Sequence, residues 1–135
     1  MDNQSVIGKP YESFGKGDVP AVLQLISDDA SWEHWEKNAA QAKGVPYLQA
    51  GKGKKGAGDF FASLAGVEMR DFRVLGLLAG GNKVCAEVVI EFKVKATGKI
   101  LPDEELHLWT LNERGQVVAF RHYIDTAKHI EANSS

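Results

Sequence analysis

The sequence is poor in several features that would place a protein in a specialised class. It has one cysteine, Cys85, among 135 residues, which excludes an internal disulfide and a multi-thiolate metal site. No apolar run approaches the roughly 20 residues that a membrane-spanning helix needs. Residues 1–6 lack the charged and then hydrophobic order of a signal peptide. We therefore expect a cytoplasmic protein with no membrane partner.

A large excess of charge of one sign is also missing. The formal net charge is -2, so no overall field would attract a nucleic acid, and we expect no nucleic-acid partner. The chain is 44% hydrophobic and 25% charged, which is the balance of a soluble domain with one core. We expect a single domain over residues 1–135.

A nucleotide-binding motif is suggested only by residues 51–56, GKGKKG, which match G-x-G-x-x-G. The preceding residues are broken by Pro46, and no βαβ pattern surrounds the match. We interpret residues 36–58 as a mobile glycine-rich loop, with an entrance patch for an anionic ligand as the alternative. Proton-transfer chemistry needs no cofactor, and we expect none.

Hydrophobic spacing predicts helices in the first half of the chain and strands in the second. Apolar residues recur at helical intervals in residues 6–14 and 18–26, and a third helix is expected to begin at Asp59. Strands are predicted at residues 30–35, 69–78, 83–95, 104–111 and 117–125. The order predicts an α+β fold in which about three helices pack on one face of a curved antiparallel sheet.

The histidines are the strongest candidates for chemistry. His34, His107 and His122 fall in predicted strands, whereas His129 falls in the C-terminal tail. Alternation places His107 beside Glu105 and Trp109, and His122 beside Phe120 and Ile124, so an inward face would put both imidazoles among apolar groups. Such imidazoles can act as general acid or base, and hydrogen-bonded structural histidines are the alternative. No H-x-H or H-x-x-x-H spacing occurs, so we expect no metal site.

A family resemblance is visible in three segments: residues 17–18 (GD), 28–34 (DDASWEH) and 120–125 (FRHYID). With this order of elements, the chain resembles the nuclear transport factor two-like superfamily, and within it the SnoaL-like polyketide cyclases, ketosteroid isomerases and limonene epoxide hydrolases. The resemblance implies a cone-shaped curved sheet wrapped around helices, an internal apolar pocket and a homodimer formed through the outer face of the sheet.

The resemblance does not preserve the catalytic residues of those enzymes. The aspartate of limonene epoxide hydrolases falls on His122, their tyrosine and asparagine fall on Trp32 and His34, and their remaining Arg and Asp fall on Val88 and Ile90. Epoxide hydrolysis by that mechanism is therefore not expected.

Ketosteroid isomerases provide a second comparison. Their base falls on His34, their buried aspartate falls on His107, and their tyrosine falls on Pro10, next to Tyr11. Because histidines occupy two of these positions, the resemblance implies a pocket that retains proton-transfer capacity.

The leading hypothesis is a small cofactor-independent SnoaL-like enzyme, of the isomerase, cyclase or hydrolase type, acting on a hydrophobic small molecule. His34 or His122 would be the base, and His107 would donate a hydrogen bond to the developing enolate. The alternative is a non-catalytic binding module in which these histidines only orient the ligand. The residues expected to form the substrate-binding walls are Tyr11, Trp32, Trp109 and Phe120.

Overall fold

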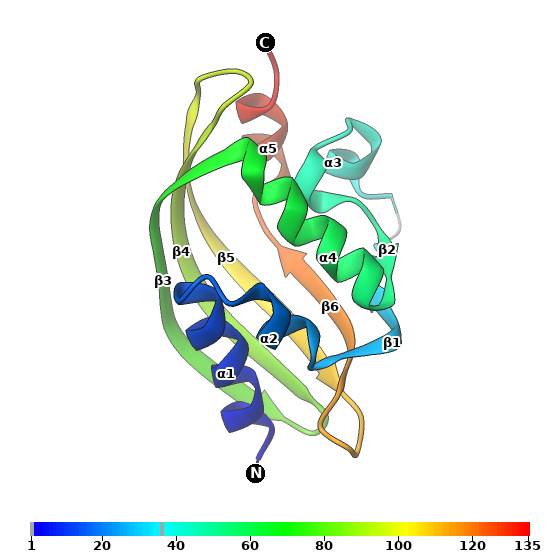
Figure 1. The fold of residues 1–135 in the computed structure, drawn as a ribbon. Helices are drawn as coiled ribbons and strands as arrows, with labels where there is room; N and C mark the ends of the chain where they lie inside the picture. The colour runs from blue at the N-terminus through cyan, green and yellow to red at the C-terminus, as the bar shows by residue number, and fades with distance from the viewer. Residues whose placement is uncertain (1, 36) are drawn as a thin grey trace.

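The computed structural model describes residues 2–35 and 37–135, and one curved six-stranded sheet dominates it (Figure 1). The strand order across the sheet is β2-β1-β6-β5-β4-β3. The strands are β1 Ile26–Trp32, β2 Gly51–Lys52, β3 Val67–Gly80, β4 Lys83–Val94, β5 Ile100–Leu111 and β6 Val117–Tyr123. The predicted α+β class is confirmed, and the long strands β3 to β6 form the expected antiparallel meander.

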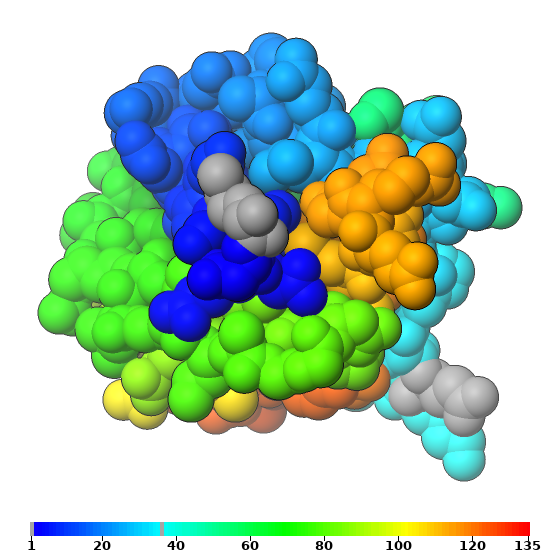
Figure 2. Space-filling model, turned by 90° about the horizontal axis from the view of Figure 1, so that it is seen from below, coloured from blue at the N-terminus to red at the C-terminus, as the bar shows by residue number. Residues whose placement is uncertain are grey.

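The helices lie against the inner face of this sheet and around its ends (Figure 1). They are α1 Asn3–Gly15, α2 Val19–Leu23, α3 Ala39–Ala42, α4 Gly53–Ser63 and α5 Thr126–Ala132, with 3₁₀ turns η1 Pro46–Leu48 and η2 Leu64–Gly66. The start of α1 lies between the β3–β4 and β5–β6 turns, and so closes one end of the sheet (Figure 2). No helix in the described part of the chain is long and apolar enough to span a bilayer.

The first strand differs from its prediction in position and direction. It covers residues 26–32 instead of 30–35, and it pairs parallel with β6, so the sheet is mixed and not wholly antiparallel. A short turn between two consecutive strands indicates that the strands are antiparallel. Because β1 and β6 are separated by most of the chain, no turn sequence indicates how they pair.

The segment 36–58 was predicted to be a mobile loop, and that prediction is wrong for its described residues. It contains α3, η1, β2 and the first turns of α4. Gly53 has φ +67, and a Cβ there would lie 2.1 Å from the carbonyl oxygen of Asp28. A Cβ on Gly51 would lie 2.7 Å from Gly56 Cα. These glycines therefore allow the start of α4 to pack against β1 and β2 at backbone contact distance.

Two of the three lysines in residues 51–56, Lys54 and Lys55, make contacts within the protein. The Nζ of Lys54 donates to two main-chain carbonyls between α2 and β1, at 2.6 and 3.0 Å. Lys55 pairs with Asp59 one turn along α4, at the surface. Lys54 thus fixes the loop before β1, and Lys55 is a solvated helix residue.

Apolar side chains are exposed on the outer face of the sheet. Leu106 and Tyr123 are directly opposite each other on β5 and β6, and are 43% and 42% exposed. Leu78 on β3 is 67% exposed. This is the face through which the resemblance implies dimer formation, and the homodimer stays a prediction.

Candidate functional site

A cavity of about 70 Å³ lies between the inner face of the sheet and the helices α1 and α4. One buried water occupies about 10–15 Å³ on this measure, so the cavity has room for several non-hydrogen atoms. Its aromatic lining is Tyr11, Phe14, Trp32, Tyr47, Phe60, Phe61, Phe72, Phe92, Trp109 and Phe120. All four residues predicted as walls are in this set. Its polar lining consists of Glu105, His107, His122 and His129.

Two of the three predicted histidines meet at this cavity. His107 on β5 and His122 on β6 are direct register partners, and their ring centroids are 4.6 Å apart. Both are buried. Because successive side chains of a strand alternate, the same face carries Glu105 and Trp109 on β5, and Phe120 on β6.

The third histidine, His34, does not reach the cavity. It is exposed, and its Nε2 lies 3.0 Å from the carbonyl oxygen of Gly51. Strand β1 ends at Trp32, and Glu33 takes a left-handed φ of 57°, which ends the side-chain alternation. Glu33 therefore turns inward and His34 outward, so the expectation that His34 faces the pocket is wrong.

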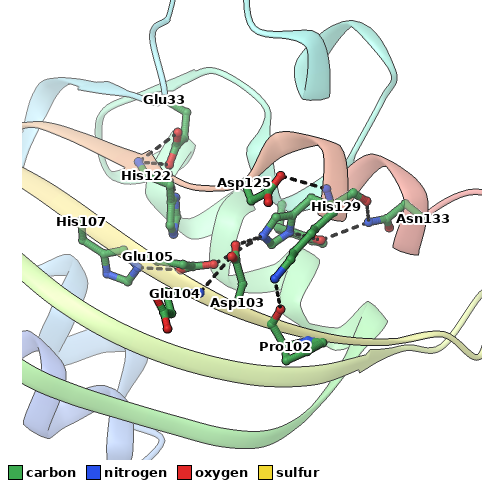
Figure 3. A network of polar contacts seen from close by, with 12 residues as sticks. Glu33, Pro102, Asp103, Glu104, Glu105, His107, His122, Asp125, His129 and Asn133 are labelled. Atoms are coloured by element: carbon green, nitrogen blue, oxygen red, sulfur yellow. Dashed lines mark hydrogen bonds and ion pairs between the residues drawn. The ribbon is translucent and has the colours of Figure 1, made fainter.

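Glu33 is instead the buried partner of His122. It is 0% exposed, and its carboxylate accepts hydrogen bonds from His122 Nδ1 and from the His122 main-chain N–H at 3.1 Å (Figure 3). It also accepts from Trp35 Nε1 at 2.7 Å. Among the described residues His122 Nε2 has no hydrogen-bond partner, so this nitrogen is available to a ligand.

The electrostatics of this pair favour a charged imidazole. Burial alone would lower the pKa of His122, but the charge and hydrogen bond of Glu33, together with the charge of Glu105, outweigh burial and raise the pKa above its usual 6.5. The Glu33 carboxylate thus favours the protonated imidazole of His122, whose Nε2–H can be donated to a ligand.

The second histidine, His107, lies in a hydrogen-bond chain of fixed direction. Trp109 Nε1 can only donate, and it donates to the Tyr11 oxygen at 2.9 Å. The Tyr11 hydroxyl then donates to His107 Nδ1 at 2.7 Å, and His107 Nε2–H donates to Glu105 Oε1 at 2.9 Å. This chain requires a neutral His107, in agreement with burial, which lowers its pKa.

A second chain of the same form lies deeper in the fold. Asn133 Nδ2 donates to the Tyr47 oxygen at 3.0 Å, and Tyr47 donates to His129 Nδ1 at 2.7 Å. His129 Nε2–H donates to Asp103 Oδ2 at 2.8 Å and lies 3.6 Å from Glu105 Oε2 (Figure 3). His129 was placed in the C-terminal tail, for which no helix was predicted, and it lies in α5, which Asp125 caps by accepting from a main-chain N–H.

Glu105 links the two chains and lines the cavity. Burial alone would raise its pKa, but the hydrogen bond from His107 and the positive charge of a protonated His122 bring the pKa below its usual value. Glu105 is therefore an ionised carboxylate in a largely aromatic cavity, and one possible ligand atom each of Glu105, His107 and His122 lies within 4.8 Å of the others.

Two clusters contain groups that can bind a metal ion. Glu105, His107 and His122 form one, and Asp103, Glu105 and His129 form the other. Both ring nitrogens of His107 and of His129 already take part in hydrogen bonds. A metal ion would have to displace them, so these residues do not fit a metal ion as they stand.

Comparison with known proteins agrees with the fold. The model of the SnoaL-like domain family matches residues 9–120. A nuclear transport factor two-like protein of unknown function from Burkholderia pseudomallei is 19% identical, with both chains fully covered and a TM-score of 0.80. A candidate SnoaL-like polyketide cyclase from Mesorhizobium loti is 18% identical over 91% of this chain and 99% of that chain, with a TM-score of 0.71.

A third solved structure is TerC co-crystallised with polyporic acid, which is 21% identical over 96% of each chain, with a TM-score of 0.74. At these identities the structural likeness shows the fold alone. No curated protein sequence matches the chain. Since the family model covers most of the sequence, from α1 to the middle of β6, the chain belongs to the SnoaL-like family.

Proposed function

We propose that this protein is an enzyme that transfers protons beside a carbonyl group, as an isomerase or an aldol-type cyclase, on a small molecule with an apolar body. The observation that supports this most is the placement of the Glu105 carboxylate and the His122 imidazole in one aromatic cavity, where the pKa of Glu105 is lowered and that of His122 is raised. A base and an acid with separated pKa values are the requirement for enolisation near neutral pH.

The proposed reaction follows from these two groups. Glu105 takes the proton from the carbon next to the carbonyl, and that C–H electron pair forms the C=C bond of the enol. The carbonyl oxygen receives the Nε2 proton of His122, which becomes neutral while Glu33 retains its hydrogen bond to Nδ1. In an isomerisation, Glu105 returns its proton to another carbon of the conjugated enol while the enol O–H proton goes back to His122 Nε2. In a cyclisation, the enol carbon attacks a second carbonyl, whose oxygen takes the proton from Glu105, while the enol O–H proton goes back to His122 Nε2.

The roles differ from those expected from the sequence. Glu105 replaces His34 or His122 as the candidate base, because His34 lies outside the cavity and the raised pKa of His122 suits an acid. His107 cannot donate to the enolate, because its Nε2–H is given to Glu105 and its Nδ1 accepts from Tyr11. We therefore assign His107 and Tyr11 to positioning the carboxylate, a role that needs no change in their own protonation.

The proposal is tested with cyclopentanone, a compact ketone with exchangeable α-protons. In D₂O the protein is expected to accelerate loss of the α-proton signals, followed by ¹H NMR, at least about tenfold over buffer. The rate is expected to be bell-shaped with pH, since protonation of Glu105 removes the base at low pH and deprotonation of His122 removes the acid at high pH.

A non-catalytic binding module would give a different result in the same NMR experiment. Cyclopentanone would then shift protein signals in a saturable way while its α-protons exchange no faster than in buffer. That combination would contradict the proposed enzyme and support the binding module.

A further inference from the structure

The buried Glu33 carboxylate accepts hydrogen bonds from two residues. His122 donates to it through Nδ1 and through its main-chain N–H at 3.1 Å, and Trp35 donates through Nε1 at 2.7 Å. Among the described residues, Trp35 is thus the only residue besides His122 that donates to this carboxylate. The direction in which Glu33 faces His122 therefore depends on where the Trp35 indole is held.

The indole is held by a cluster on the outer face of the sheet, which we call the Trp35 stack: Trp35, Arg121 and Tyr123. The Arg121 guanidinium carbon lies 4.4 Å from the centroid of the Trp35 ring and 4.2 Å from that of the Tyr123 ring. The two rings are 6.2 Å apart and nearly parallel, at 19°. Because Arg121 and Tyr123 flank the inward-facing His122 on β6, they point away from the cavity.

We propose that Trp35 is a positioning residue for the acid of the site, and that it acts through Glu33 without contacting the ligand. This role rests on the proposed function, in which His122 is the acid. Trp35 is not part of the cavity lining, whereas His122 is. Its N–H fixes the carboxylate that holds the His122 ring, which is the kind of support a precisely oriented catalytic group requires.

The charges around the pair determine how the Trp35 N–H responds to protonation. A donor binds more strongly to a carboxylate whose charge is not balanced by a neighbouring imidazolium. When His122 loses its proton, the hydrogen bond from Trp35 to Glu33 is therefore expected to strengthen. The other charged or titratable side chains close to the pair or to the indole are Glu105, His107 and Arg121.

The first measurement uses the wild-type protein and needs no ligand. In ¹H–¹⁵N spectra, the Trp35 indole proton is expected to move downfield as the pH rises, with the same pKa that the ring nitrogens of His122 report. The Trp109 indole is an internal comparison, because it donates to the neutral Tyr11 hydroxyl. A Trp35 signal that stays constant while His122 titrates would overturn the inference.

The second measurement uses Trp35→Phe, which keeps an aromatic ring in the Trp35 stack and removes the N–H. Exchange of the cyclopentanone α-protons is expected to slow about tenfold, the contribution of one hydrogen bond to a charged group. The dissociation constant of the ketone should stay within about twofold of the wild type, since Trp35 does not line the cavity. A residue with only a structural role would not separate rate from affinity in this way.

The matched control is Tyr123→Phe, which removes a polar hydrogen from the other ring of the same stack. Tyr123 is 42% exposed, and it does not donate to Glu33. This variant is expected to exchange the ketone at the wild-type rate. Urea unfolding of both variants shows that the compared proteins are folded.

The outcomes separate the two proposals. A folded Trp35→Phe protein that binds the ketone and exchanges it at the wild-type rate would overturn the inference. A Trp35 signal that follows His122 in a wild-type protein without exchange activity would support the link from Trp35 to Glu33 and contradict the proposed function. Because the titration uses the wild-type protein, it decides the inference even if a variant fails to fold.

Discussion

Replacing His122 by asparagine is expected to slow the α-proton exchange of cyclopentanone by about 10²–10⁴-fold, the usual contribution of a positioned general acid or base. The asparagine amide has a donor near the position of Nδ1, so it can keep a hydrogen bond to Glu33. It has no atom at the position of Nε2, which is the nitrogen that would give its proton to the ketone. The rate constant from ¹H NMR in D₂O measures the effect.

The matched control is His34→Asn, because His34 is an exposed histidine outside the cavity. This variant is expected to exchange the ketone at the wild-type rate. Both variants are compared by urea unfolding, so that a loss of folded protein is not mistaken for a loss of chemistry. A His122→Asn protein that is folded, binds the ketone and stays within about twofold of the wild-type rate would show that His122 takes no part in the transfer.

Glu33→Gln has the largest expected effect on stability. The variant leaves a buried imidazolium without its counter-ion, and the new amide presents an NH₂ donor where the carboxylate accepted from His122 and Trp35. We expect a loss of about 3 kcal/mol in the free energy of unfolding at about pH 6. Urea denaturation followed by tryptophan fluorescence measures it.

The pH dependence of this loss has a defined sign. The pKa of His122 is raised in the folded protein, so the pair stabilises the fold fully below the unfolded pKa, and this stabilisation is lost as pH rises through the folded pKa. Above that pH both proteins have a neutral His122. The loss in Glu33→Gln is then expected to fall to about 1–2 kcal/mol, the cost of imperfect hydrogen bonds.

Glu104→Gln is the control for this experiment, because the Glu104 side chain is exposed on the opposite face of β5. Its effect is expected to stay within about 0.5 kcal/mol at either pH. If Glu33→Gln destabilises the protein by no more than Glu104→Gln at about pH 6, the Glu33–His122 pair is not charged in the folded protein.

Much of the fold could be predicted from the sequence, because the second half of the chain consists of alternating strands joined by short turns. Strands β3 to β6 are consecutive, alternate in hydrophobicity and are joined by short turns, so their order and direction can be read locally. The parallel contact of β1 with β6 is long-range, and the packing of α4 on β1 depends on backbone contact at Gly53. Neither contact leaves a local periodic signal.

The residues of the candidate site were predicted correctly where side chains alternate regularly along a strand, and were missed where this alternation ends. His107, Trp109 and Phe120 lie within regular strands, and their expected facing agrees with the cavity lining. Glu33 was assigned to the face opposite His34, but its positive φ reverses both side chains at the end of β1. A left-handed residue other than glycine has no reliable sequence signal, so this exchange of positions could not be anticipated.

The hydrogen-bond chain through Tyr47 and His129 was not predicted, for a different reason. Asp103, Glu105 and His107 alternate on one face of β5, and this spacing of three polar residues was visible in the sequence, whereas their burial was not. Its partners Tyr47 and His129 come from η1 and α5, two elements that the sequence interpretation treated as loop and tail. Burial of these residues depends on tertiary packing alone.

The most direct test of the account is the protonation state of the imidazoles, read from ¹⁵N chemical shifts during a pH titration of the wild-type protein. We expect the His122 imidazole to titrate above the usual pKa near 6.5, with both ring nitrogens protonated below that pH. His107 should stay neutral, with its proton on Nε2. A His122 ring that is already neutral at about pH 6 would contradict the claim that Glu33 holds a charged acid at the cavity.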